Sequence, residues 1–297
     1  MNVAAVVVRW RGGEEVERCL ASLLAFGGET LSRIILVDSG SGDGGAERLA
    51  AKFPEIEVLA LDANQSFAHA ANRGTATVDE ELVFLLNPDT EIVEDTVPTL
   101  TATAARRPDS AGVVPLLVNP DGSSQHRWQL RRLPTVGRLA TGRPGAPACK
   151  QPPVGEIAIE QPAAAAWLVR RDVWKALDGF DESFTPAWWE DVDLCARLAG
   201  KTGDPGFPAD EGFVVAPNAR VVHVGGSSVN ELGRADFLKA YYGNLLRYAD
   251  RHHAGQTGLI RLGLRCSLIG RSVLRPSLRA ATFESFRSLT RPRAADR

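Results

Sequence analysis

Acidic side chains follow apolar segments at several points of the chain, a spacing that suits chemistry at the edge of a sheet. Asp38 and Asp89 each come directly after an apolar run, and Asp43 lies in a Gly- and Ser-rich loop behind Asp38. Pro88 cannot donate to a sheet ladder, so pairing is expected to stop there and to present Asp89 just beyond the strand Leu82–Leu86. Ligands of open α/β sheets bind at this edge, outside the carboxyl ends of the strands.

A second acidic cluster lies later in the chain. Glu190, Asp191 and Asp193 open a segment with helical periodicity, and His223 ends a late apolar segment. A site for a metal-bound diphosphate needs oxygen ligands for a hard cation, and a separate carboxylate that takes a proton from the acceptor. Taken singly, each residue also fits a structural role, as a turn residue, a helix N-terminal acid, an i,i+4 partner or a core histidine. Their joint occurrence in this order favours a site.

The elements that must position these residues alternate along the first 110 residues. Val3–Val8, Ile34–Val37, Ile56–Leu61 and Leu82–Leu86 are short apolar segments typical of buried strands. Segments with helical periodicity separate them. This alternation predicts right-handed crossovers and an α/β fold, with a mainly parallel central sheet flanked by helices.

The rhythm changes in the second half of the chain. Residues 134–162 are rich in Pro, Gly and Ala and predict a long loop. Phe213–Val215 and Arg220–His223 predict two short strands, and a helix follows them. We therefore expect one domain over residues 1–250 and a C-terminal helical extension over residues 251–297.

Composition limits the classes of protein to which the chain can belong. Its 297 residues, with 44% hydrophobic residues, are typical of a globular protein with one large domain or one domain and an appendage. A formal net charge of −2 gives no reason to expect nucleic-acid binding. Four scattered cysteines fit the reducing cytoplasm. The apolar N-terminus resembles a first strand and not a signal peptide. The sequence has no run of about 18 apolar residues, so we expect no membrane-spanning helix.

The segment from residue 251 onward is basic and amphipathic. Apolar residues are interleaved with arginines, and only Glu284 and Asp296 oppose them in its second half. The arginines are Arg261, Arg265, Arg271, Arg275, Arg279, Arg287, Arg291 and Arg293. This pattern predicts a membrane-surface element, and the alternative is a solvated helix packed on the domain.

Several motifs occur together in the order of one known family. They are Val37-Asp38-Ser39-Gly40-Ser41-Gly42-Asp43-Gly44, Asn64 to Gly74, Leu85-Leu86-Asn87-Pro88-Asp89-Thr90, Gly179-Phe180-Asp181-Glu182, Trp189-Glu190-Asp191-Val192-Asp193-Leu194-Cys195, and Ala216 to Ser227. With them the chain resembles family 2 glycosyltransferases of the GT-A fold over residues 1–250. Within that family it is most similar to bacterial cell-wall and O-antigen rhamnosyltransferases.

The resemblance implies roles on the donor side of a site. Asp38 matches the carboxylate that contacts the donor nucleobase, and Asp43 lies beside it. Asn87 stands at one of two positions that hold a metal-binding acidic pair in relatives, and we assign it to nucleotide-sugar binding. Arg73 is the candidate for a contact with a donor phosphate, and a position on the helix surface is the alternative.

The resemblance also implies the metal, the base and the acceptor contacts. Asp89 and His223 match the ligands of a Mg²⁺ or Mn²⁺ ion, and Asp191 matches the catalytic base of inverting members. The acceptor-binding candidates are Trp188, Trp189 and Glu190.

The chain departs from the family pattern at the donor end. Arg9-Trp10-Arg11 stands where relatives usually have Thr-Tyr-Asn, and Ser39 stands where many have Asn. Asn87 is not a carboxylate, so Asp89 is expected to depend on His223 or on the donor phosphates. These departures leave the identity of the donor open.

The function implied is inverting, metal-dependent transfer of rhamnose from dTDP-rhamnose to a polyprenyl-diphosphate-linked saccharide. The enzyme would then work at the cytoplasmic face of the cell membrane, in cell-wall or surface polysaccharide synthesis. One alternative keeps the fold with another donor, such as UDP-galactofuranose, UDP-GlcNAc or another hexose donor. The other is a homologue that binds nucleotide-sugar without catalysis.

Overall fold

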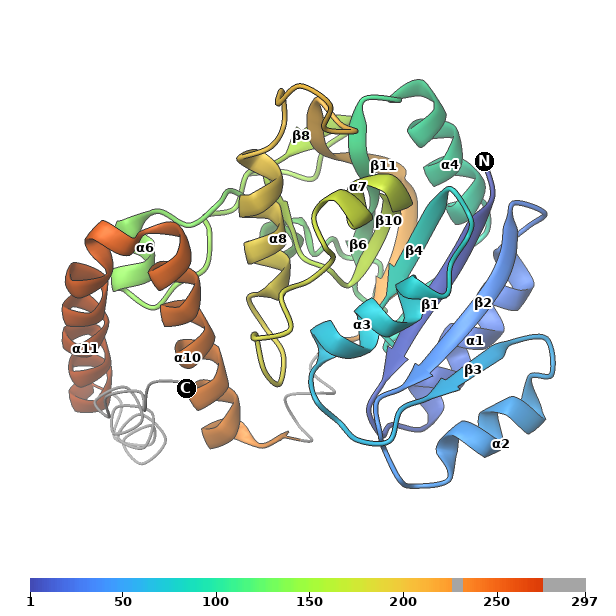
Figure 1. The fold of residues 1–297 in the computed structure, drawn as a ribbon, viewed down its shortest axis with the longest axis horizontal. Coiled ribbons are helices and arrows are strands. Elements are labelled where there is room, and N and C mark those ends of the chain that lie inside the picture. The colour runs from blue at the N-terminus through green and yellow to red at the C-terminus, as the bar shows by residue number, and fades with distance from the viewer. Residues whose placement is uncertain (226–231, 275–297) are drawn as a thin grey trace.

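A computed structural model describes residues 1–225 and 232–274, with side chains to residue 271, and shows a mixed sheet with helices on both faces (Figure 1). The sheet has nine strands in the order β3-β2-β1-β4-β10-β6-β11-β5, with β8 paired to β11. The strands are β1 Val3–Arg9, β2 Leu31–Asp38, β3 Glu57–Ala60, β4 Leu82–Leu86, β5 Thr90–Ile92, β6 Ser110–Val118, β8 Ile157–Ile159, β10 Ala166–Arg170 and β11 Glu211–His223. A separate small ribbon pairs β7 Leu130–Arg131 with β9 Gln161–Pro162.

The predicted α/β fold is confirmed. Strands β3, β2, β1 and β4 are parallel, as are β6 and β11. Strand β10 lies antiparallel between β4 and β6, so it joins the two parallel groups. Because β1, β2 and β4 run in one direction, their carboxyl ends meet at one edge, where the acidic residues follow them.

The two faces of the sheet bury alternate side chains of each strand. In β1, Val3, Ala5 and Val7 contribute to one apolar cluster, and the residues between them contribute to the other. Helices α1 Glu14–Phe26, α2 Gly45–Lys52 and α4 Thr96–Arg106 cover the first face. Helices α3 Phe67–Ala76, α7 Arg171–Ala176 and α8 Glu190–Ala199 cover the second. This burial on both faces explains the continuous apolar runs of the strands.

Two expectations about the second half of the chain were wrong. Residues 134–162 are not a structureless loop, because they contain α6 Val136–Ala140 and strands β8 and β9. The two short strands predicted after residue 212 form one strand, β11, with a shift in register between Ala216 and Arg220. Pro217 and Asn218 interrupt the apolar pattern at this irregularity, which made one strand resemble two.

The C-terminal helices form a separate layer beside the sheet (Figure 1). Helix α10 Arg234–His252 and helix α11 Thr257–Leu274 pack with α6 around a third apolar cluster. The expected boundary at residue 250 falls inside α10, and α11 buries Ile260, Leu264 and Leu268 in this cluster. No helix in the described part of the chain is long and apolar enough to cross a bilayer. The arginines from Arg275 onward lie outside the described residues.

Candidate active site

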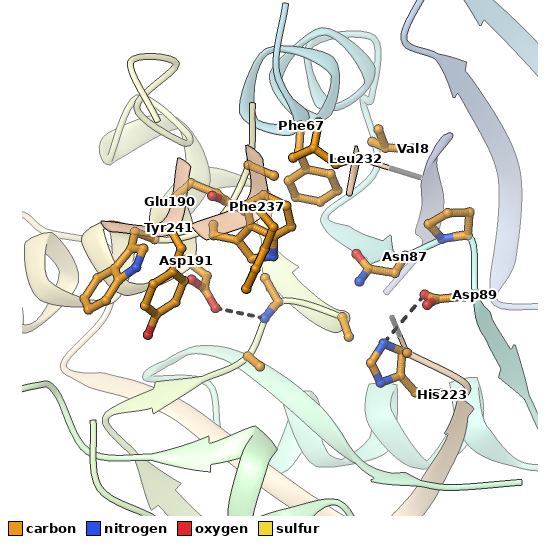
Figure 2. A pocket seen from close by; sticks show the side chains of 18 of the residues that line it. Val8, Phe67, Asn87, Asp89, Glu190, Asp191, His223, Leu232, Phe237 and Tyr241 are labelled. Carbon is orange, nitrogen blue, oxygen red and sulfur yellow. Dashed lines mark hydrogen bonds and ion pairs between the residues drawn. The ribbon is translucent and has the colours of Figure 1, made fainter. Parts of the chain in front are cut away.

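A cavity of about 1170 Å³ opens where the parallel strands end. Its lining comes from the segments after β1, β2 and β4, from the end of β11, and from α8 and α10. Figure 2 shows Asn87, Asp89 and His223 on one side of this cavity and Glu190, Asp191 and Tyr241 on the other. Residues distant in sequence therefore share one space with two chemically different ends.

The first end places a carboxylate opposite an imidazole. Asp89 follows β4, His223 ends β11, both are buried, and Asp89 Oδ1 lies 3.6 Å from His223 Nε2 (Figure 2). The strand β5 brings them together, since Thr90 pairs with His223 across the β5–β11 ladder. Burial lowers the pKa of His223, although the charge of Asp89 opposes this shift, so the ring is neutral at neutral pH.

Gln125 fixes which nitrogen of His223 carries the proton. Its Nε2 donates to the backbone oxygen of His223 at 2.7 Å and to Asn119 Oδ1 at 2.7 Å. Its Oε1 then lies 2.9 Å from His223 Nδ1, which must donate to it. The lone pair of the neutral ring is therefore on Nε2 and faces Asp89. A carboxylate oxygen of Asp89 and the imidazole Nε2 of His223 are thus both placed to contact one ligand between them.

This arrangement fits a divalent cation. A carboxylate oxygen and a neutral imidazole nitrogen are both ligands of Mn²⁺, and the carboxylate alone is typical of Mg²⁺. Among the described residues, no group of three or more His, Cys, Asp or Glu side chains could hold a metal. A cation held by Asp89 and His223 therefore keeps positions for substrate phosphates.

The second end holds a half-buried carboxyl group with defined donors. Asp191 Oδ1 accepts a hydrogen bond from the backbone N–H of Val192 at 2.8 Å. Its Oδ2 accepts bonds from Gln161 Nε2 at 3.2 Å and from the backbone N–H of Ala164 at 3.4 Å. Burial raises the pKa of Asp191, while the positive charge of Arg131 and these donors oppose the rise.

Glu190 differs from its neighbour. Burial and the charge of Asp191 raise the pKa of Glu190 well above the ordinary value of a glutamate. Its Oε2 and the indole nitrogen of Trp189 are buried with no hydrogen-bond partner among the described residues. Two adjacent carboxyl groups cannot both ionise easily, and the larger rise in pKa is that of Glu190, so Glu190 keeps its proton to higher pH than Asp191.

The two tryptophans before α8 adopt a backbone conformation that is rare for such residues. Trp188 and Trp189 have φ of 73° and 79°, in the left-handed region that bulky residues avoid. Asn244 of α10, which is buried, donates from Nδ2 to the backbone oxygens of Thr185, Ala187 and Trp188 at 2.9–3.1 Å. Helix α10 thus holds this strained loop against the cavity, and both tryptophans line it.

Arg9 explains the unusual sequence at the end of β1. Its fully buried guanidinium forms ion pairs with Asp38 and, at 2.7 Å, with Asp43. Its hydrogen bond lowers the pKa of Asp43. Gly45 is required beside it, since a Cβ there would lie 2.3 Å from the guanidinium. The two carboxylates are therefore paired with one guanidinium within the protein, and neither lines the cavity.

Most of the expected site residues surround the cavity, and three do not. Those in its lining are Asn87, Asp89, Trp188, Trp189, Glu190, Asp191 and His223. Asp38 and Asp43 lie behind the lining with Arg9, and Arg73 is exposed on α3 outside it. At the donor end the lining comes instead from Trp10, Arg11, Ser39 and Asn64.

Sequence reasoning missed several residues of the lining. Gln125, Trp128 and Arg131 lie in the cavity, and Trp128 stacks on His223 with ring centroids 5.2 Å apart. They follow the Asp121-Gly122 turn in a stretch without clear periodicity. The only available signal was their composition, an amide, an aromatic ring and an arginine close together in a predicted irregular segment.

The fold and the site define a class of protein. The structure is similar to that of GalNAc-T7 with UDP, GalNAc and Mn²⁺, with a TM-score of 0.62 and 14% identity over 86% of this chain, which spans half of that chain. It is also similar to S. aureus TarS 1–349, with a TM-score of 0.53 and 14% identity over 97% of this chain and 89% of that one. The fold is that of GT-A glycosyltransferases.

Sequence comparison places the chain within this class. Residues 5–155 match glycosyl transferase family 2, and the chain belongs to that family. It is 29% identical, over 92% of its length and 93% of theirs, to N-acetylglucosaminyl-diphospho-decaprenol L-rhamnosyltransferase from Mycobacterium tuberculosis strains CDC 1551 / Oshkosh and ATCC 25618 / H37Rv.

Proposed function

We propose that the protein transfers L-rhamnose from dTDP-rhamnose to a polyprenyl-diphosphate-linked saccharide in surface polysaccharide synthesis. The observation that carries this proposal is the similarity to the mycobacterial rhamnosyltransferase, which extends over 92% of the chain. The cavity, with a possible cation site at one end and a buried carboxylate at the other, supports a sugar transfer between two bound substrates.

Asp191 is the proposed general base of an inverting reaction. The acceptor hydroxyl loses its proton to Asp191 and attacks the anomeric carbon from the face opposite the leaving diphosphate. Asp191 lies half-buried on α8, and hydrogen bonds from two backbone N–H groups fix its orientation. A general base must come within about 2.6–3.2 Å of the hydroxyl that it deprotonates. The protonated Glu190 beside it is available to donate a hydrogen bond to the acceptor sugar.

Asp89 and His223 are the proposed holders of Mg²⁺ or Mn²⁺. When bound, such a cation stabilises the negative charge that develops on the leaving nucleoside diphosphate. Gln125 orients His223 for this task, and Asn87 lines the cavity next to Asp89. Trp188 and Trp189 offer aromatic faces to the acceptor sugar. Asp38 and Asp43, held by Arg9, would support the nucleobase end from behind the lining, and Arg73 has no contact with the cavity in this arrangement.

We further propose that the C-terminal helices associate with the cytoplasmic face of the membrane, where a polyprenyl acceptor is embedded. Leu259, Leu262 and Ile269 are more than half exposed on α11, on the side opposite its packed residues. A helix with an apolar outer face and interspersed arginines is suited to the interface of an anionic leaflet.

A donor screen tests the proposal. The purified protein is incubated with dTDP-rhamnose, UDP-galactofuranose or UDP-GlcNAc and a prenyl-diphosphate-linked GlcNAc, with and without EDTA. We expect a product of added rhamnose mass from dTDP-rhamnose only, with inverted anomeric configuration by NMR, that is lost in EDTA and restored by Mg²⁺ or Mn²⁺. Transfer from another donor overturns the choice of sugar, and turnover of none favours the non-catalytic alternative.

A further inference from the structure

Arg131 is a cavity-lining cation to which the described residues offer no hydrogen-bond or ion-pair partner. It belongs to the short strand β7, which pairs with β9 so that Arg131 lies opposite Gln161, the residue that donates to Asp191. Among the residues that the structure describes, its side chain forms no hydrogen bond or ion pair, and its Nε is buried without a partner. A buried Nε–H group without a hydrogen bond is costly, and an anion whose oxygens bridge this group and a terminal N–H of the guanidinium would satisfy it.

The aromatic ring beside Arg131 orients its guanidinium and leaves the N–H groups at the edge of the guanidinium available to a ligand. Its Cζ lies 5.8 Å from the centroid of the Trp128 ring, a cation–π distance. Trp128 is itself stacked on His223, and 47% of its surface is exposed. The stack His223–Trp128–Arg131 therefore runs from the candidate cation site toward Asp191. Arginine backed by an aromatic ring presents its N–H fork to a planar or tetrahedral oxyanion.

We propose that Arg131 binds the phosphate oxygens of a diphosphate-bearing substrate. This inference rests on the proposed function, in which both substrates carry a diphosphate. One source is the nucleoside diphosphate of the donor, which Arg131 would hold together with the cation site. The other is the lipid-linked diphosphate of the acceptor, which Arg131 would hold while Asp191 faces the acceptor hydroxyl.

The charge of Arg131 also reaches Asp191, and this effect is separable from anion binding. A role limited to Asp191 would change the pH dependence of the rate and would leave phosphate affinity unchanged. A phosphate-binding role changes affinity even when no reaction takes place. The test therefore starts with binding in the absence of metal, sugar donor and acceptor.

Calorimetric titration with inorganic pyrophosphate and with dTDP in EDTA is the first measurement. Arg131→Gln is compared with Arg131→Lys, which keeps a charge, and with Arg132→Gln, an exposed neighbour outside the cavity lining. We expect pyrophosphate affinity to fall by about tenfold or more in Arg131→Gln, less in Arg131→Lys and not in Arg132→Gln, because charge-assisted bonds to phosphate are lost. Thermal unfolding of each variant verifies that it is folded.

Two further arms identify the source of the phosphate. Weaker binding of dTDP in Arg131→Gln assigns the residue to the donor. For the acceptor, the KM of Arg131→Gln for prenyl-diphosphate-linked GlcNAc is compared with its KM for octyl GlcNAc, which lacks phosphate. A rise in KM for the diphosphate acceptor alone assigns Arg131 to the acceptor. Unchanged affinity for pyrophosphate, dTDP and the diphosphate acceptor overturns the proposal, as does a change confined to the pH profile. The pyrophosphate titration remains valid whichever sugar is transferred.

Discussion

Glu190 and Asp191 are neighbours in sequence, and their surroundings give them different protonation states. Burial raises the pKa of both. Asp191 alone receives hydrogen bonds from Ala164 and Gln161 and the field of Arg131, which stabilise its charge. The assignment of base and proton donor is therefore a consequence of three separate segments that meet at the start of α8.

The pH dependence of the reaction tests this assignment. In the proposed mechanism Asp191 is the base, so activity requires its ionised form. A raised pKa then means that activity falls while the pH is still above the ordinary aspartate value of about 3.9. We expect the acid limb of kcat/KM to lie above that value. A limb at or below pH 4 would argue against the buried base.

Replacement of the same carboxylate gives a complementary result. Asp191→Asn keeps the shape of the side chain and removes the proton acceptor, so the rate should fall by about 10²–10⁴-fold. Binding of dTDP, measured by calorimetry, should not change, since the proposed mechanism places the nucleotide at the other end of the cavity. Full transfer activity in this variant would falsify the mechanism.

Gln125 orients His223, one of the two proposed cation ligands. Gln125→Leu removes the acceptor that holds the proton on Nδ1, so Nε2 loses its fixed lone pair and Mn²⁺ affinity should fall by about 10–100-fold. Electron paramagnetic resonance of free Mn²⁺, in a titration with dTDP present and no sugar donor, measures this directly. The exposed Gln151→Leu is the matched control. Equal Mn²⁺ affinity in both variants and the wild type would show that Gln125 has no positioning role.

Among the elements, α10 positions the residues before α8. One face of α10 contributes to the third apolar cluster, and Asn244 on the same helix binds three backbone oxygens of the loop 185–188. Aromatic contacts reinforce this link, since Trp188 packs edge-on against Phe237 and Trp189 contacts Tyr241. The strained conformation of the two tryptophans persists because a separate helix holds their loop.

Asn244→Ala should release this loop. Loss of the buried amide leaves carbonyl oxygens without donors and should lower the free energy of unfolding by about 1–3 kcal/mol. Acceptor KM should rise more than donor KM, because the loop carries Trp188 and Trp189. Chemical denaturation and steady-state kinetics measure the two effects, with the exposed Lys239→Ala of α10 as control. Equal changes in both KM values would indicate a general loss of stability instead.

At the scale of the whole molecule, the C-terminal layer has one apolar side that the residues described by the structure do not cover. Helix α11 contacts α6 and α10 through Ile260, Leu264 and Leu268, while Leu259 and Leu262 are 63% and 60% exposed. This layer lies beside the cavity, which α10 also lines through Tyr241 and Tyr242. A membrane bound by α11 would thus lie near the acceptor end of the site.

Vesicle binding tests this arrangement. Leu259→Asp/Leu262→Asp in the full chain should reduce co-sedimentation with vesicles that contain phosphatidylglycerol severalfold, because both residues are exposed and contribute only to the interface. Binding of the wild type should weaken with salt, as screening requires, and should be low on phosphatidylcholine alone. Unchanged co-sedimentation of the double variant, or a wild type that does not bind, would exclude α11 as the contact.

The alternation of apolar segments and helical periodicity was sufficient to predict the α/β fold, because each strand is buried on both faces and each helix on one. It also located Asp89, Asp191 and His223, since motif residues at strand and helix ends carry a local signal. The same local reading failed at β11, where an irregularity made one strand resemble two. It also failed over residues 134–162, where strands of two and three residues and a helix of five are too short to show a period.

Long-range packing decided the remaining features of the site. No local pattern indicates that Arg9 turns inward to pair with Asp38 and Asp43, that Gln125 orients His223, or that Arg131 reaches the space beside Asp191. These contacts join residues that are far apart in sequence, and they depend on how β10, β11 and α10 are placed against the parallel strands. The types and order of the residues determine which chemistry is available to this chain. Only the packing of its segments sets the charge, protonation and orientation of the site residues, because burial and neighbouring groups control all three.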